Sequence, residues 1–166
     1  MFPPKMVRLS EEVLAACRIA GLRLTIAESC TGGLLAGCLT AVAGSSDVVD
    51  RGFVTYTNAA KIAMLGVQEA TLEAYGAVSE DVAAEMAKGA LDRSDAAIAV
   101  SITGIAGPGG SEHKPEGRVC FGLATATACT TETVEFGALG RAQVRQAARD
   151  HALGILSNAL VALPHT

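Results

Sequence analysis

The chain has 166 residues and a formal net charge of −4, and 50 % of its residues are hydrophobic while only 4 % are aromatic. This length suits one ordinary domain that builds its own core without help from disulfides or metal. The acidic balance argues against a protein that grips nucleic acid, and no uninterrupted apolar run approaches the ~18 residues of a membrane span.

The cysteines and histidines show no pattern of a metal site. There are five cysteines without a CxxC spacing and three widely separated histidines. An odd number of cysteines within predicted core segments indicates reduced, mostly buried thiols, and the histidines lack the spacing of metal ligands. We therefore expect a cytoplasmic protein with no metal and no cofactor.

The hydrophobic pattern predicts alternating helices and strands. Residues 1–9 lack the apolar core of a secretion signal and are expected to form a flexible lead-in. A helix is predicted from Ser10, acting as N-cap, to Gly21, then a strand over 23–28 and a helix over 34–43. The later elements are a strand over 52–57, helices over 59–65 (capped by Asn58), over 69–75 and after Ser79, strands over 96–103, 117–127 and 131–137, and a long helix from about Arg141.

This order predicts an α/β fold. Early alternation of helix and strand favours a mainly parallel sheet with helices on both faces, and the hairpin over 117–137 adds an antiparallel strand. We expect one three-layer α/β/α domain over 10–166, with a five-stranded mixed sheet that contains one antiparallel strand. Ligands bind beyond the carboxyl ends of the strands in such sheets. The predicted strand ends carry Ser29, Tyr56 and Thr103, which should meet on one rim.

Ser29 is a candidate nucleophile because it lies where the first strand hands over to a helix. Unpaired N–H groups at a helix start can hold an anion or a developing oxyanion. A serine hydroxyl also needs a base, and a lysine serves when burial or a neighbour lowers its pKa. Lys61, five residues after Tyr56, is the most suggestive lysine. Tyr56 is expected to relay the proton or to position the amine.

Each of these residues also has a simpler role. A serine before a helix commonly serves as an N-cap, a strand tyrosine packs in the core, and a lysine is usually a solvated charge. Cys30 is a rival nucleophile beside Ser29, although a buried thiol is usually inert. The residues alone favour a hydrolase or a phosphate-ligand site and leave these roles open.

Glycine-containing segments are candidates for substrate binding. Thr31-Gly32-Gly33 opens a predicted helix, and Gly44-Ser45-Ser46 forms a turn cluster. Thr103-Gly104 begins a loop over 104–110 whose backbone can approach a ligand closely. This loop fits neither the Walker nor the dinucleotide pattern, so a tight turn and a phosphate cradle both stay open. Arg141, at the start of the last helix, is either solvated or able to reach a phosphate.

Four segments in the same order resemble the CinA C-terminal family, and the resemblance extends from about Ser10 to Leu163. They are Ala27-Glu28-Ser29-Cys30-Thr31-Gly32-Gly33, Tyr56-Thr57-Asn58-Ala59-Ala60-Lys61, Gly76-Ala77-Val78-Ser79 and Thr103-Gly104-Ile105-Ala106-Gly107-Pro108-Gly109-Gly110, while Lys114-Pro115 and Gly117 fit a K-P-x-G segment. The resemblance implies a five-stranded mixed sheet between helix layers. It also implies a nicotinamide-nucleotide amidase, which hydrolyses nicotinamide mononucleotide to nicotinate mononucleotide and ammonia without a metal.

On this resemblance Ser29 is the nucleophile, Lys61 and Tyr56 activate it, and Thr103 shapes the substrate site. Longer relatives carry an additional N-terminal domain, so the chain looks like the stand-alone form. The family commonly has Gly-Asp-Arg before the last helix, whereas this chain has Leu139-Gly140-Arg141 and lacks that aspartate.

Two other functions stay open: a catalytically silent module that binds pyridine nucleotides, and an interaction partner of a CinA-like N-terminal domain. The expected small-molecule partner is a pyridine mononucleotide. Alanine-rich apolar helices also lead us to expect a homo-oligomer.

Overall fold

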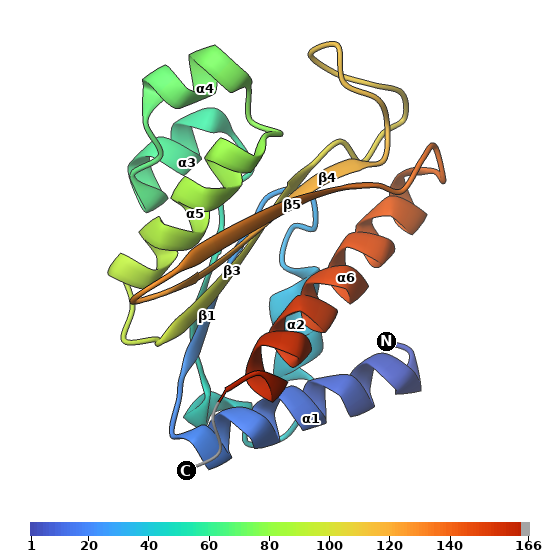
Figure 1. The fold of residues 1–166 in the computed structure, drawn as a ribbon. Helices are drawn as coiled ribbons and strands as arrows, with labels where there is room; N and C mark the ends of the chain where they lie inside the picture. The colour runs from blue at the N-terminus through green and yellow to red at the C-terminus, as the bar shows by residue number, and fades with distance from the viewer. Residues whose placement is uncertain (164–166) are drawn as a thin grey trace.

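The computed structural model describes residues 1–163, so residues 164–166 of the predicted domain lie outside the described part of the chain. None of the helices in this part combines the length and the apolar character that a bilayer-crossing segment requires. In chain order the elements are α1 (Pro4–Ala20), β1 (Leu24–Glu28), α2 (Leu34–Thr40), the 3-10 helix η1 (Ser45–Asp47), β2 (Val49–Val54), α3 (Asn58–Leu65), α4 (Glu69–Tyr75), α5 (Glu80–Asp92), β3 (Ile98–Gly104), β4 (Arg118–Thr125), β5 (Cys129–Glu135) and α6 (Arg141–Val161) (Figure 1).

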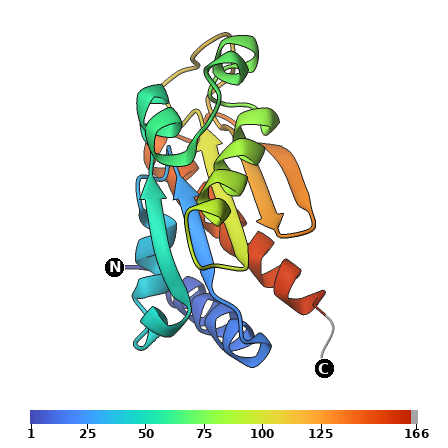
Figure 2. The same ribbon diagram turned by 90° about the vertical axis from the view of Figure 1, so that its left-hand side faces the viewer.

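Within residues 1–163 the strands form one five-stranded sheet in the order β2-β1-β3-β4-β5. β1 pairs in parallel with β2 and β3, whereas β4 pairs antiparallel with β3 and with β5. β5 therefore runs in the same direction as β1, β2 and β3, and β4 alone is reversed (Figure 2). The predicted α/β fold, with a mainly parallel sheet and one antiparallel strand, is confirmed.

Helices cover both faces of the sheet, with α1, α2 and α6 on one face and α3, α4 and α5 on the other (Figure 1). Successive side chains of a strand point to opposite faces, so Ile26 and Val100 pack with the first set of helices and Ala27 and Ala99 with the second. Small residues let α5 approach the second face closely. A side chain at Gly122 would meet the Ala83 carbonyl oxygen at 2.5 Å.

The first helix begins at Pro4, six residues before the predicted start at Ser10. Proline suits the first helical turn because its missing N–H needs no partner there. Ser10 is buried within the helix, where its hydroxyl donates to the Met6 carbonyl oxygen at 2.9 Å. The predicted flexible lead-in is therefore wrong for residues 4–9. Phe2, just ahead of the helix, lies under the Arg149 guanidinium.

The second strand also lies earlier than predicted, at Val49–Val54. The chain then leaves the sheet, and Tyr56 lies in the connection that follows. The hydroxyl of Thr57 accepts a hydrogen bond from the Ala60 amide, so Thr57 caps α3 in place of Asn58. The last helix begins at Arg141, as predicted.

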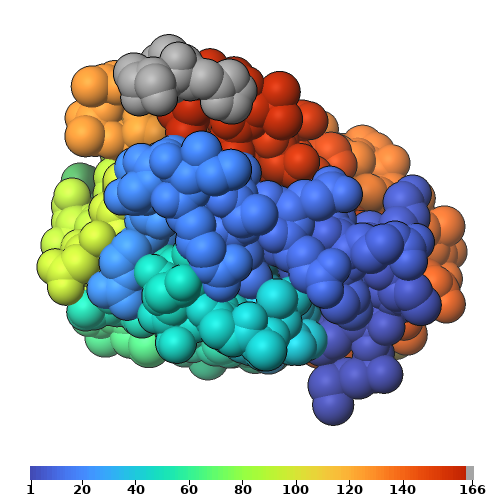
Figure 3. Space-filling model, turned by 90° about the horizontal axis from the view of Figure 1, so that it is seen from below, coloured from blue at the N-terminus to red at the C-terminus, as the bar shows by residue number. Residues whose placement is uncertain are grey.

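The end of the molecule at which β1 and β2 begin is closed by α1 and by the turn before β2. Arg18 of α1 donates to both carboxylate oxygens of Asp47 and to the Gly44 carbonyl oxygen. Figure 3 shows this end, where the N-terminal residues (blue) lie beside α6 (red). The opposite end, where β1 and β3 stop, carries loops together with α3 and α4 (Figure 2).

Candidate active site

Ser29 lies in a tight turn that joins β1 to α2. Its amide donates to the Ile102 carbonyl oxygen of β3 at 3.0 Å, which fixes the turn to the neighbouring strand. Gly32 and Gly33 then reverse the chain with φ of +55° and +101°, values that suit glycine because it lacks a Cβ. The serine is 8 % exposed. The sheet therefore holds it in place at the carboxyl end of a central strand.

Lys61 contacts Ser29 directly. Its Nζ donates to the Ser29 hydroxyl oxygen at 3.0 Å and to the Thr55 carbonyl oxygen at 2.9 Å, and its side chain is only 1 % exposed. Burial lowers the pKa of the Lys61 ammonium below its ordinary value, because a poorly solvated environment disfavours the charged form. Lys61 therefore has both the contact and the direction of pKa shift that a general base for Ser29 requires.

Tyr56 does not lie between these two residues in the hydrogen-bond network. Its side chain is 54 % exposed, and its hydroxyl accepts a hydrogen bond from Arg141 at 2.5 Å. Arg141 also donates to the Gly107 carbonyl oxygen at 2.7 Å. Because Lys61 reaches Ser29 directly, the expected relay through Tyr56 has no place in the observed geometry.

Cys30, the rival nucleophile, has a thiol that is hard to ionise. Burial raises its pKa to about 12, and the nearby charge of Glu28 acts in the same direction. Since the thiolate is the nucleophilic form of cysteine, Cys30 is protonated and inert near neutral pH. The geometry favours Ser29.

Glu28 is not among the predicted site residues, but it supports the turn that carries Ser29. Its buried carboxylate accepts hydrogen bonds from the Leu35 and Ala36 amides at 3.0 and 3.1 Å, in the first turn of α2. A carboxylate at a helix N-terminus satisfies unpaired amides and complements the helix dipole. Those two amides are therefore not available for an oxyanion. In the described chain no hydrogen bond engages the amides of Cys30 or Thr31, which directly follow the nucleophile.

A hollow of about 300 Å³ opens over Ser29. It is lined by Ser29, Cys30, Tyr56, Asn58, Lys61, Ala77, Val78, Arg141 and the segment 103–112. The structure thus brings together six of the predicted site residues: Ser29, Tyr56, Lys61, Thr103, Gly104 and Arg141. Ala77, Val78 and Glu112 belong to the lining although the sequence reasoning did not select them as site residues.

Thr31, Gly32 and Gly33 lie next to this hollow but do not line it. Thr31 is fully buried, and its hydroxyl oxygen has no hydrogen-bond partner among the described residues. Arg145 of α6 donates to the carbonyl oxygens of Cys30 and Thr31 at 3.1 and 3.4 Å. These residues shape the turn from behind, so their predicted contact with substrate is not supported by the geometry.

Gly44, Ser45 and Ser46 lie at the other end of the sheet. β2 begins at Val49, which pairs with Leu24 at the start of β1, so the turn before β2 lies at the amino ends of the strands. Ser29 follows the carboxyl end of β1. The prediction that 44–46 binds the same substrate is therefore wrong. The sequence held a usable signal, because a turn between a helix and a following parallel strand returns to the amino edge.

One wall of the hollow is formed by Ala77 and Val78, in the connection between α4 and α5. The Thr103 hydroxyl donates to the Ala77 carbonyl oxygen at 2.8 Å. Lys114 donates to the carbonyl oxygens of Tyr75 and Val78, both at 2.6 Å. Thr103 and Lys114 thus hold this wall from two sides.

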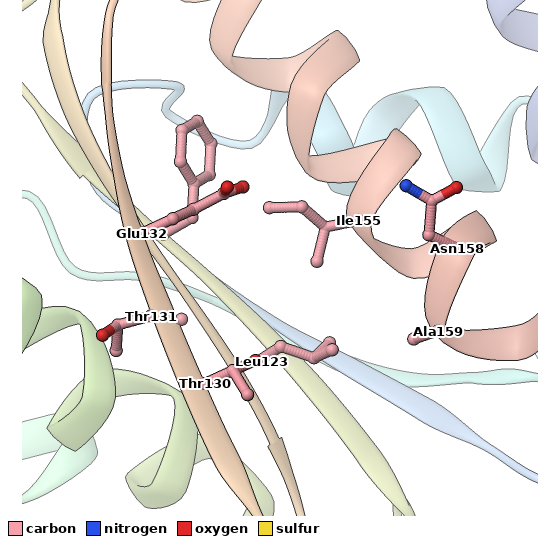
Figure 4. A pocket seen from close by; sticks show the side chains of 9 residues that line it. Leu123, Thr130, Thr131, Glu132, Ile155, Asn158 and Ala159 are labelled. Atoms are coloured by element: carbon pink, nitrogen blue, oxygen red, sulfur yellow. The ribbon is translucent and has the colours of Figure 1, made fainter. Parts of the chain in front are cut away.

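A larger hollow of about 370 Å³ lies between α6 and the β4–β5 edge of the sheet. Figure 4 shows Leu123 of β4 and Ile155 of α6 pointing into it. Its carboxylate, Glu132, is hydrogen-bonded to His151. The lining contains no serine, cysteine or lysine, so this hollow lacks the pairing of a hydroxyl with an amine that is found over Ser29. Residues 1–163 hold no group of three or more His, Cys, Asp or Glu side chains placed to bind a metal ion.

The model of the CinA C-terminal domain family matches residues 6–160. The chain belongs to this family. The solved structure of the competence/damage inducible protein CihA from Agrobacterium tumefaciens superposes with a TM-score of 0.92 and 48 % identity, covering 97 % of this chain and 98 % of that one. The family assignment made from the four sequence segments is confirmed.

Curated relatives of this chain carry several kinds of name. The nicotinamide-nucleotide amidohydrolase PncC of Enterobacter agglomerans is 57 % identical over 125 residues, 75 % of this chain and 76 % of that protein. PncC of Escherichia coli K12 is 55 % identical over 127 residues, 76 % and 77 % of the two chains. A putative competence-damage inducible protein of Caldicellulosiruptor saccharolyticus is 47 % identical over 155 residues, which are 92 % of this chain but 37 % of that protein.

Proposed function

We propose that this protein is a nicotinamide-nucleotide amidase, which hydrolyses nicotinamide mononucleotide to nicotinate mononucleotide and ammonia. The observation that carries the proposal is the 3.0 Å contact between the Ser29 hydroxyl and a buried lysine amine inside an open hollow. Two relatives that are more than half identical over about three quarters of the chain are named for this activity. A hydroxyl nucleophile with an adjacent base is the arrangement that acyl transfer from an amide requires.

In the first half-reaction, Ser29 Oγ attacks the carboxamide carbon while neutral Lys61 takes the hydroxyl proton. In the neutral amine one N–H bonds the Thr55 carbonyl oxygen, and rotation about the last side-chain bond can turn the lone pair toward the Ser29 proton. The carbonyl oxygen becomes an oxyanion, and the amide of Cys30, a residue that lines the hollow, is the candidate donor to it. Lys61 then gives its proton to the amide nitrogen, the C–N bond breaks, and ammonia leaves a nicotinoyl ester on Ser29.

In the second half-reaction, Lys61 takes a proton from water as the water oxygen attacks the ester carbon. The bond to Ser29 Oγ breaks, the serine recovers its proton, and nicotinate mononucleotide is released. Arg141 and the loop over 104–110 line the part of the hollow that would hold the ribose and phosphate. Guanidinium groups suit phosphate because of their charge and their fork of N–H donors. Tyr56 contributes by positioning Arg141 through its hydroxyl.

The test is ammonia release from nicotinamide mononucleotide by the wild type and by Ser29→Ala, Cys30→Ala and Lys61→Ala variants. The wild type and Cys30→Ala should release ammonia, and the other two should not. Full activity in Ser29→Ala, or its loss in Cys30→Ala alone, would contradict the mechanism. Tight nucleotide binding by the wild type with no turnover would instead identify a catalytically silent binding module.

A further inference from the structure

Glu112 lies at the tip of a hairpin in the connection between β3 and β4. Ser111 and Lys114 exchange backbone hydrogen bonds of 3.0 and 2.8 Å, which leaves Glu112 and His113 as the two central residues. Both have positive φ, +50° and +63°. Two-residue turns of this kind are dominated by Gly, Asn and Asp, since other side chains are strained there. Strained backbone residues of this kind cluster at active sites and ligand-binding sites, where the surrounding structure holds a side chain in a fixed position.

This hairpin is fixed to the wall of the active-site hollow. Lys114 donates to the carbonyl oxygens of Tyr75 and Val78, so the hairpin is tied to the connection between α4 and α5. The Glu112 carboxylate lies against Gly76, where an added side chain would meet its Oε2 at 2.5 Å. The absence of a side chain at Gly76 therefore leaves room for the carboxylate beside the hollow that Glu112 lines.

The hollow is lined by two side chains of opposite charge, and the Lys114 ammonium lies near the first of them, beside Gly76. Glu112 is the one carboxylate in its lining, and Arg141 is the one guanidinium. Neither takes part in an ion pair within residues 1–163. The charge of Glu112 also reaches Lys61, whose pKa it raises against the larger effect of burial. A substrate whose carboxamide reaches Ser29 would lie in the same hollow as this carboxylate.

We propose that Glu112 is a specificity-determining residue whose carboxylate faces the positively charged pyridinium ring of the substrate, while Arg141 faces the phosphate. This rests on the proposed function, because nicotinamide mononucleotide carries a cationic ring and an anionic phosphate. The ring nitrogen lies only a few bonds from the carboxamide carbon that Ser29 attacks. A neutral ring of the same shape gains nothing from the carboxylate, so the hollow selects the oxidised nucleotide over its uncharged reduced form.

Binding of both nucleotides by calorimetry tests this assignment. A Ser29→Ala background prevents turnover, and the ligands are nicotinamide mononucleotide and its reduced, dihydropyridine form. Glu112→Gln should raise the Kd of the oxidised nucleotide about ten-fold and leave that of the reduced one unchanged, as expected for one partly solvated charge pair. Glu112→Lys should raise the Kd of the oxidised nucleotide further than Glu112→Gln does, because it places a positive charge beside the cationic ring. Glu73→Gln, which removes an exposed carboxylate of α4 outside the hollow, is the matched control and should change neither Kd.

Equal weakening of both nucleotides in Glu112→Gln, or no weakening of either, would overturn the assignment. Ammonia release by the wild type is measured separately. If the wild type releases no ammonia, the amidase proposal fails. If it releases ammonia and Glu112→Gln does not discriminate between the nucleotides, only the assignment of Glu112 fails.

Discussion

Replacing Lys61 by Met separates the chemistry of this residue from its role in the fold. Methionine has similar length and keeps the buried volume filled, but it cannot accept a proton. General-base catalysis contributes ~10²–10⁴-fold to rate, so kcat should fall by about 10³, or ~4 kcal/mol in barrier height. KM should change little, because Nζ is engaged by the Ser29 hydroxyl and the Thr55 carbonyl within the protein.

The substitution should also change how the free energy of unfolding depends on pH. The folded-state pKa of Lys61 is lowered, so between that pKa and the ordinary value of 10.5 the unfolded chain binds one more proton than the folded one. The contribution of Lys61 to the free energy of unfolding of the wild type therefore rises with pH between these two pKa values. Above 10.5 this contribution is complete. The Met variant lacks this dependence but leaves the Thr55 carbonyl without its donor, at a cost of ~1–3 kcal/mol. The free energy of unfolding of wild type minus variant should thus increase from pH 7 to pH 10.

The assays are steady-state ammonia release and urea unfolding of both proteins at pH 7 and pH 10. Subtracting the variant removes the contribution of all other titrating groups that the two chains share. A difference in unfolding free energy that stays flat or falls with pH would refute the buried, easily deprotonated state of Lys61. A kcat within a few-fold of wild type would refute its role as base.

Three further predictions follow from the same site. The wild-type kcat/KM should rise with pH with a midpoint below 10.5, since only neutral Lys61 accepts the serine proton, and a profile flat from pH 6 to 10 would count against this. Cys30→Ala should keep kcat within a few-fold of the wild-type value. Cys30 of the wild type should resist alkylation at pH 7, because the pKa of its thiol is about 12. Rapid labelling would show that this thiol is accessible and ionised. Glu28→Ala should lower the urea-unfolding free energy by ~1–2 kcal/mol, as for a lost helix cap, because the Leu35 and Ala36 amides lose their acceptor; unchanged stability would show that the cap contributes nothing.

The parts of the site that follow parallel strands could be predicted from sequence. Apolar, β-branched runs mark β1 and β3, and parallel strands bring their carboxyl ends to one edge, so Ser29 and Thr103 meet there. The contact of Lys61 with Ser29 follows from the next connection, where Thr57 starts α3 one turn before the lysine.

Contacts between residues that no local sequence motif links could not be predicted in this way. Glu28 reaches amides seven and eight residues ahead, which no short capping motif describes. Glu112 enters the site because Lys114 ties its hairpin to a connection almost 40 residues earlier in the chain, and no local pattern specifies that pairing. The homo-oligomer expected from the alanine-rich helices stays a prediction, which the molar mass in solution would test.

Arg145 links α6 to the turn that follows β1, because its guanidinium donates to the carbonyl oxygen of Cys30, 115 positions earlier in the sequence. During synthesis, β1 and its serine leave the ribosome long before α6 does. The nascent chain therefore carries the nucleophile without the arginine that braces its turn. The turn gains these hydrogen bonds only when α6 docks, so a chain that still lacks α6 has the nucleophile but not the arginine that fixes its turn.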